Sequence, residues 1–117
     1  MKQESYDNMM KLTCRSFNPD ETLQVLKGTN LWGFFSWGVS KLLRIPKKNY
    51  GYVGLLMKVN GHHHKGYVLI TLNFLDLYDV HLLNNQYKVK ESITDIYFDE
   101  LFNVIDGKIE RIPEYNR

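Results

Sequence analysis

The sequence predicts an α+β domain: a short N-terminal helix, an antiparallel sheet of four to five strands, and a C-terminal helix packed on one face. Two observations predict this class. Apolar residues alternate with period two through the middle of the chain, between turn signals, and a 3.6-residue period follows near the C-terminus. The chain has 117 residues, of which 44% are hydrophobic, so we expect a single domain over residues 1–117.

The first helix signal starts at Asn18. Asn18 can cap a helix, Pro19 suits its first position, and the two acids that follow favour the positive end of the helix dipole. Gly28 is a natural stop, so we expect a helix of about two turns. Residues 1–17 are expected to form a flexible N-terminal segment.

The segment between this helix and the sheet is rich in aromatic residues. Residues 31–37 favour a strand, and Gly33 and Gly38 suggest a bulge or a close backbone approach. Residues 40–45 fit either a strand or a short helical turn. We expect a loop over residues 46–49.

Four strands are predicted after this loop. Residues 52–59 alternate in polarity, and the Asn60-Gly61 turn signal leads into a hairpin loop. Residues 67–73 are apolar on both faces, as a central strand requires. Residues 77–83 complete a second hairpin, and residues 87–91 form a last short strand.

The C-terminal helix is predicted from its apolar spacing. The residues that share one face are Phe98, Leu101, Phe102, Ile105, Ile109 and Ile112. Asp99 and Glu100 are expected in the first turn and Arg111 in the last, where their charges suit the helix dipole. Pro113 ends the helix, and residues 113–117 are expected to form a tail.

Charge is distributed unevenly along the chain. The formal net charge of +2 divides into −1 for residues 1–21, +7 for the acid-free residues 22–75, and −4 for residues 76–117. Such asymmetry concerns binding partners rather than the fold.

Six basic residues within the acid-free segment lie among aromatic residues. They are Lys41, Arg44, Lys47, Lys48, Lys58 and Lys65. Lysine with exposed aromatic rings is a common means of holding single-stranded nucleic acid. The alternative is that the aromatic residues form the core and the lysines solvate the sheet or protect an edge strand. Nucleic-acid binding requires most of the six on one contiguous surface.

Three consecutive histidines, His62, His63 and His64, raise the question of a metal site. Consecutive side chains in a turn point in different directions, and His81 is the only other histidine. We therefore interpret the histidines as a polar hairpin loop and expect no metal and no cofactor.

The carboxylates Asp76 and Asp79, three residues apart, raise the question of a catalytic pair. General acid and base catalysis requires two carboxyl groups that face one cavity. Asp76 more simply caps a turn, and Asp99 serves the helix N-terminus. An enzyme is the least expected function, because it requires at least two of Asp76, Asp79, Asp99 and His81 to converge in a cleft.

The sequence also bears on location. The single cysteine, Cys14, excludes an internal disulfide and is compatible with a reducing compartment. The N-terminus lacks the apolar core of a signal peptide, and no apolar run approaches the ~20 residues that span a bilayer. We expect a cytoplasmic protein that does not bind membranes.

Three motifs occur in a characteristic order. They are Val68-Leu69-Ile70-Thr71-Leu72-Asn73, Asp76-Leu77-Tyr78-Asp79-Val80 and Tyr97-Phe98-Asp99-Glu100-Leu101. In this order the chain resembles a family of short proteins encoded by phages and by integrated or conjugative bacterial elements. The family has no assigned activity, so the resemblance implies a context and no catalytic residues. We expect Tyr78 and Tyr97 to hold the second hairpin against the C-terminal helix.

Together these features predict a small noncatalytic accessory or binding domain. It would act through a protein partner or through self-association, with an exposed apolar patch or an open strand edge. The alternative is a nucleic-acid-binding module that uses the basic segment 22–75.

Overall fold

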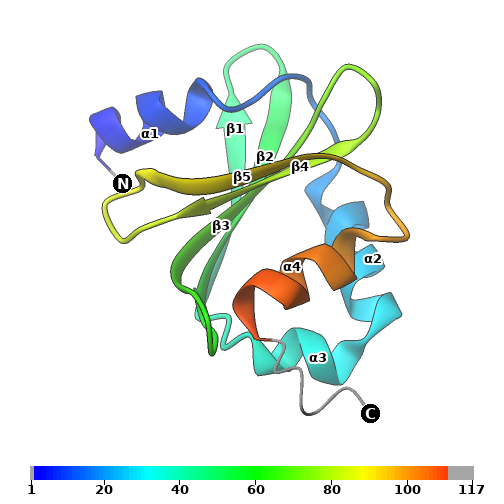
Figure 1. The fold of residues 1–117 in the computed structure, drawn as a ribbon. Helices are drawn as coiled ribbons and strands as arrows, with labels where there is room; N and C mark the ends of the chain where they lie inside the picture. The colour runs from blue at the N-terminus through cyan, green and yellow to red at the C-terminus, as the bar shows by residue number, and fades with distance from the viewer. Residues whose placement is uncertain (1, 111–117) are drawn as a thin grey trace.

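A computed structural model describes residues 2–110 and confirms the α+β class. The elements are α1 (Gln3–Met10), α2 (Pro19–Thr29), α3 (Leu31–Ser36), β1 (Lys41–Lys47), β2 (Gly51–Asn60), β3 (Lys65–Leu72), β4 (Tyr78–Leu83), β5 (Val89–Ile96) and α4 (Leu101–Ile109). The strands form one antiparallel sheet in the order β1-β2-β3-β4-β5 (Figure 1). The central position of β3 and the two hairpins around it are as predicted.

Helices α2, α3 and α4 pack on one face of the sheet, which we call the covered face (Figure 1). Its core contains residues from all three helices and from strands β2 to β5. The fully buried side chains here include Leu26, Trp37, Ile70 and Ile105. This face holds the larger of the two hydrophobic clusters.

Helix α1 alone packs on the opposite face, which we call the half-covered face. Met9 is fully buried there against a smaller cluster of strand residues. These strand residues are Ile45, Val53, Leu56, Tyr67, Leu69 and Leu83. Because α1 is only 8 residues long, it covers one part of the sheet and leaves polar side chains over the rest.

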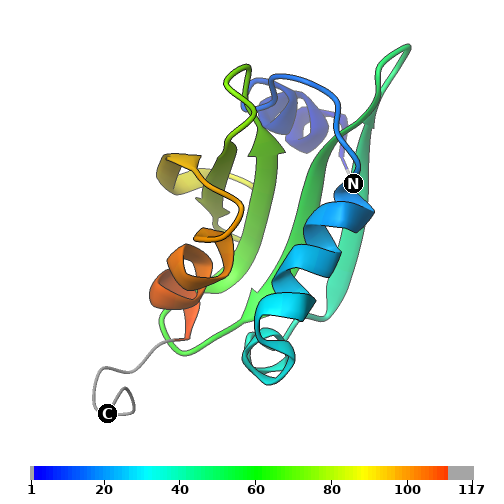
Figure 2. The same cartoon turned by 90° about the vertical axis from the view of Figure 1, so that its right-hand side faces the viewer.

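The chain between α1 and α2 joins the two hairpins. Arg15 N–H donates to the carbonyl of Leu72 on β3 at 3.3 Å, and Phe17 N–H donates to the carbonyl of Tyr52 on β2 at 3.0 Å. Figure 2 shows this blue segment passing between the tips of the β1–β2 and β3–β4 hairpins. Neither this bridge nor helix α1 is predicted by local sequence signals, because both depend on contacts far along the chain.

Helix α2 begins as predicted, with the Asn18 side chain accepting a hydrogen bond from Asp20 N–H at 3.0 Å. It runs to Thr29, one residue beyond the predicted stop, so Gly28 lies inside the helix.

The predicted strand over residues 31–37 is wrong, because this segment forms helix α3. The Asn30 side chain caps the helix by accepting from Gly33 N–H at 2.8 Å. Trp37 then stacks on Phe102 of α4 with ring centroids 5.0 Å apart. Tertiary packing of these rings therefore overrides the strand preference of the aromatic residues.

The strand boundaries differ from prediction at two places. Residues 40–45 form a strand, and β1 continues through Pro46 to Lys47 across a register shift, where a loop was predicted. The last strand covers residues 89–96 instead of 87–91, because Tyr87 lies in the preceding turn with φ 63.

Helix α4 begins later than predicted. Glu100 is its N-cap and Asp99 precedes it, so neither acid lies in the first turn, and Phe98 is exposed. A Cβ atom on Gly61 would lie 2.1 Å from Ile109 Cγ2, so a glycine is required where the β2–β3 loop meets α4. The predicted positions of Arg111, Ile112 and Pro113 and of the tail 113–117 lie outside the described residues.

Candidate functional site

The six basic residues of the acid-free segment separate into three groups. Arg44 pairs with Asp20 of α2, with Nη2 2.6 Å from Oδ1, and this carboxylate raises the pKa of Arg44. Lys47 and Lys48 lie at the tip of the β1–β2 hairpin, where the Lys47 ammonium is 5.0 Å from the Tyr50 ring centroid. The six residues therefore do not form one surface.

The third group, Lys41, Lys58 and Lys65, lies on the half-covered face. Lys58 is paired across the ladder with Tyr67, and its ammonium is 5.8 Å from the Tyr67 ring centroid. Directly paired residues share a face, which places Lys41 beside Lys58. Lys65 lies two residues before Tyr67 on β3 and so shares its face.

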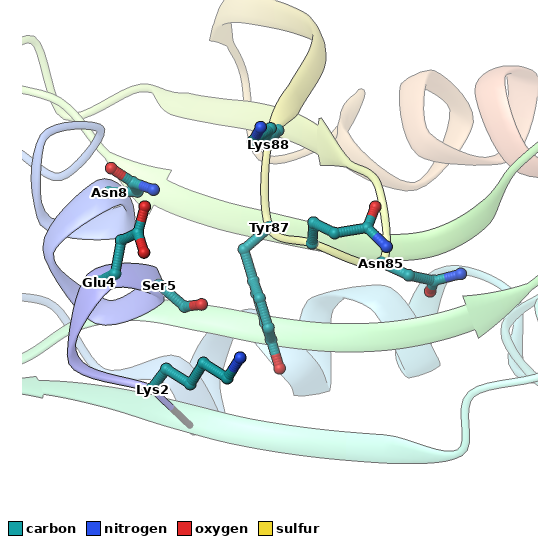
Figure 3. Close-up of a pocket in the computed structure, with 8 residues that line it drawn as sticks. Lys2, Glu4, Ser5, Asn8, Asn85, Tyr87 and Lys88 are labelled. Carbon is teal, nitrogen blue, oxygen red and sulfur yellow. The ribbon is translucent and has the colours of Figure 1, made fainter.

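Two shallow pockets lie near these lysines, one on the half-covered face and one at the end of the sheet where β2 meets β3. One of about 660 Å³ is lined by α1 and the β4–β5 turn, and Figure 3 shows Lys2, Asn85 and Tyr87 around it. The other, of about 380 Å³, is lined by Lys58 and Lys65 among others. Asn85 lines both pockets, so we treat them as one feature and call it the trough.

Tyr87 is held firmly in the wall of the trough. Its ring stacks on Tyr67 with centroids 4.4 Å apart, and its hydroxyl donates to the Tyr67 hydroxyl at 3.0 Å. This hydrogen bond, with burial, raises the pKa of Tyr87 to about 12. The Asn84 side chain accepts from the Gln86 and Lys88 amides, which fixes the turn. A positive φ at a tyrosine is a strained conformation that such contacts must maintain.

The outer edge of β1 is a second candidate surface. β1 is an edge strand, and Leu42 and Leu43 are 38% and 41% exposed. Its seven residues include three bases and no acid. Near its end, the Pro46 carbonyl already accepts a hydrogen bond from the Tyr6 hydroxyl at 2.6 Å. The stretch from Lys41 to Ile45 is therefore the part of this edge open to a partner.

Helix α3 presents an exposed apolar surface. Trp32 is 81% exposed and Phe35 is 56% exposed, and their rings meet edge to face at 6.2 Å. An exposed tryptophan of this extent is typical of a contact surface.

Asp76 does not make the turn cap expected of it, and Asp79 is part of a structural network. Asn73 caps the β3–β4 turn by accepting from the amides of Leu75 and Leu77, so the prediction that Asp76 does so is wrong. Asp76 instead pairs with Arg15. Asp79 is buried and accepts from Asn73 Nδ2 at 3.0 Å, so it forms part of a structural network.

His81 is buried on β4, two residues from Asp79. Its Nδ1 lies 2.7 Å from Ser92 Oγ, and burial lowers its pKa below the ordinary 6.5 while Asp79 opposes the shift. Asp99, in contrast, is exposed beyond the end of β5. Asp79 and His81 share a strand face, but the pockets described above are lined by other residues.

The histidine loop, residues 62–64 between β2 and β3, is hydrogen-bonded to the C-terminal end of α4. His63 N–H donates to the Ile109 carbonyl at 2.6 Å, and His62 N–H donates to the Glu110 carboxylate at 2.7 Å. His64 is buried, with Nε2 3.1 Å from the Tyr67 carbonyl. Within residues 2–110, no group of three metal-ligating side chains is close enough to hold a metal ion.

The two motif tyrosines do not join the second hairpin to α4 as predicted. The Tyr78 hydroxyl is 2.9 Å from Thr22 Oγ1, so it contacts α2. Tyr97 is 58% exposed. Leu101 is buried in the core of the covered face, which is the structural role expected of it.

Comparison with protein-family models, curated proteins and solved structures gives no match for the chain. None of the helices over residues 2–110 has the length and hydropathy needed to cross a membrane. Sequence reasoning missed Lys2, Asn85, Tyr87 and Lys88 of the trough. The Asn84-Asn85 turn signal was the one pointer to them, and the opposite wall, α1, had not been predicted.

Proposed function

We propose that the protein is a noncatalytic binding domain that acts through a protein partner. The partner contributes an extended segment with acidic side chains, which pairs with the outer edge of β1. Addition of a strand to an open sheet edge is a general mode of peptide recognition, in which main-chain hydrogen bonds give affinity and side chains give specificity.

The observation that supports this proposal is the combination of an open edge with one sign of charge. β1 has a partner strand on one side only, and its basic residues are Lys41, Arg44 and Lys47. Leu42 and Leu43 project to opposite faces of the sheet and are both partly exposed, so an added strand gains apolar contact on each face. Acidic residues on the partner would lie beside Lys41 and Lys47, since the Arg44 guanidinium already pairs with Asp20.

The same charges disfavour pairing between two copies of the chain. An antiparallel β1–β1 pair centred on Arg44 places Lys41 of each copy opposite Lys47 of the other. Like charges directly opposite one another destabilise a strand pair. A second copy is therefore a poorer partner for this edge than an acidic strand.

A peptide-binding experiment tests the proposal. A fluorescent peptide with alternating acidic and β-branched residues is titrated with the wild type and with the variant Lys41→Glu/Lys47→Glu, followed by anisotropy. We expect binding that weakens at least ~10-fold in the variant, because like charges then face each other. The control is Lys90→Glu on the opposite edge strand, β5.

Equal binding by the variant would contradict the proposal, as would no binding by the wild type. The basic residues would then serve only to protect the edge from pairing. The resemblance to proteins of phages and mobile elements supports an accessory role of this kind in the cytoplasm.

A further inference from the structure

We infer that the trough on the half-covered face is a second binding site, and that its ligand is a single-stranded nucleic acid. This site differs from the outer edge of β1 in its lining and its ligand, although Lys41 at the start of β1 borders both. Its walls come from α1, from the segment between α3 and β1, from β2 and β3, and from the β4–β5 turn.

The trough is positively charged. Four lysines line it, Lys2, Lys58, Lys65 and Lys88, against one acid, Glu4. No ion pair joins any of the four to a carboxylate within residues 2–110. Their charges are therefore available to an anionic ligand, and Lys41 adds a fifth ammonium beside Lys58.

The distribution of these lysines favours a polymer over a single phosphate group. Lys2 precedes α1, Lys58 and Lys65 lie on neighbouring strands, and Lys88 lies in the turn after β4. Charges spread over several elements match the repeated phosphates of an extended strand. A single phosphate is bound best where several donors converge on one point.

The remaining lining groups suit exposed bases. Asn8, Asn60, Asn85 and Gln86 supply amide groups, each of which both donates and accepts hydrogen bonds. Unpaired bases offer the same mixture on their edges. These amides can therefore pair with base edges while the lysines contact phosphates.

The strain at Tyr87 supports a functional role for this wall. Its left-handed backbone is maintained by the ring stack on Tyr67 and by the Asn84 side chain. Figure 3 shows the Tyr87 side chain lying between Lys2 and Asn85. The turn is thereby ordered before a ligand arrives, which lowers the entropic cost of binding.

The test is anisotropy of a labelled ten-nucleotide oligothymidine at low ionic strength, with full-length protein. We expect binding that weakens with salt, with a log–log slope of about −3 for four phosphate contacts. Lys58→Glu/Lys65→Glu should weaken binding at least ~10-fold and reduce the slope by about 1.4. The control Lys47→Glu/Lys48→Glu makes the same charge change at the hairpin tip and should change binding less than ~2-fold.

A second variant, Lys2→Glu/Lys88→Glu, replaces exposed side chains only and should weaken binding to a similar extent even if the first variant unfolds. No binding by the wild type, or equal loss in trough and tip variants, would overturn the inference. Competition by poly-glutamate or by a mononucleotide as effective as that by unlabelled oligothymidine would also overturn it. The variant Lys58→Glu/Lys65→Glu leaves every β1 residue in place. Loss of oligothymidine binding in this variant with acidic-peptide binding retained distinguishes the trough from the β1 edge, so the two proposals fail separately.

Discussion

The two faces of the sheet are built differently. Three helices close the covered face, and its core joins residues from nearly every element of the chain. The half-covered face has one short helix, a smaller cluster, a strained tyrosine and buried polar atoms, Thr71 Oγ1 and His81 Nε2, that have no partner within the described residues. The difference indicates that stability is concentrated on one face, which leaves the other able to hold charged and strained groups.

The largest expected effect is on the covered face. Ile105 is fully buried between α4 and the sheet, so Ile105→Ala leaves a cavity in the main core. We expect the free energy of unfolding to fall by about 3 kcal/mol, measured by urea denaturation. A loss below about 1 kcal/mol would show that this face is not the stable half.

A smaller and more local effect is expected at the other face. Met9 is the one fully buried side chain of α1, so Met9→Ala removes the main anchor of that helix. We expect a loss of about 2 kcal/mol. Hydrogen exchange should increase in residues 3–17 while the amides of β3 stay protected. Equal loss of protection in β3 and α1 would show that the faces unfold together.

The smallest effect is a pH dependence that arises from the half-covered face. His81 has a lowered pKa in the folded protein, so the unfolded chain binds the proton more tightly. The free energy of unfolding should therefore fall as pH drops below 6.5 and through the folded pKa. The variant His81→Gln should reduce this slope, whereas His62→Gln, at an exposed position, should not. An unchanged slope in His81→Gln would contradict the prediction.

Local signals in the sequence predicted most of the fold. The Asn18 cap, the Asn60-Gly61 turn and the two-sided apolar pattern of residues 67–73 each act over a few neighbouring residues, and each appears in the structure. The predicted strand over residues 31–37 failed because Trp37 and Phe102 stack across 65 positions of the chain. The strand propensity of single residues contains no information about a contact so distant in the sequence.

The candidate surfaces were predicted only in part. An open strand edge was predicted, although without the strand that forms it, and the structure has one at β1. Three of the six basic residues, Lys41, Lys58 and Lys65, lie on one face of the sheet. Lys2 and Lys88 were missed because a lysine in a turn or before a helix carries no signal of which face it will meet. Arg44 was assigned to a binding surface, but its guanidinium is occupied by Asp20.

The bridge made by Arg15 and Phe17 has a consequence for the order of folding. Each hairpin can form from neighbouring residues. The segment that joins their tips makes contacts of long sequence separation, since Arg15 and Asp76 are 61 residues apart. Contacts of long sequence separation tend to form later, because closing the loop costs conformational entropy before the new contacts stabilise the chain. We therefore expect the N-terminal segment to dock after the two hairpins have formed, and the wall that it supplies to the trough to be completed only then.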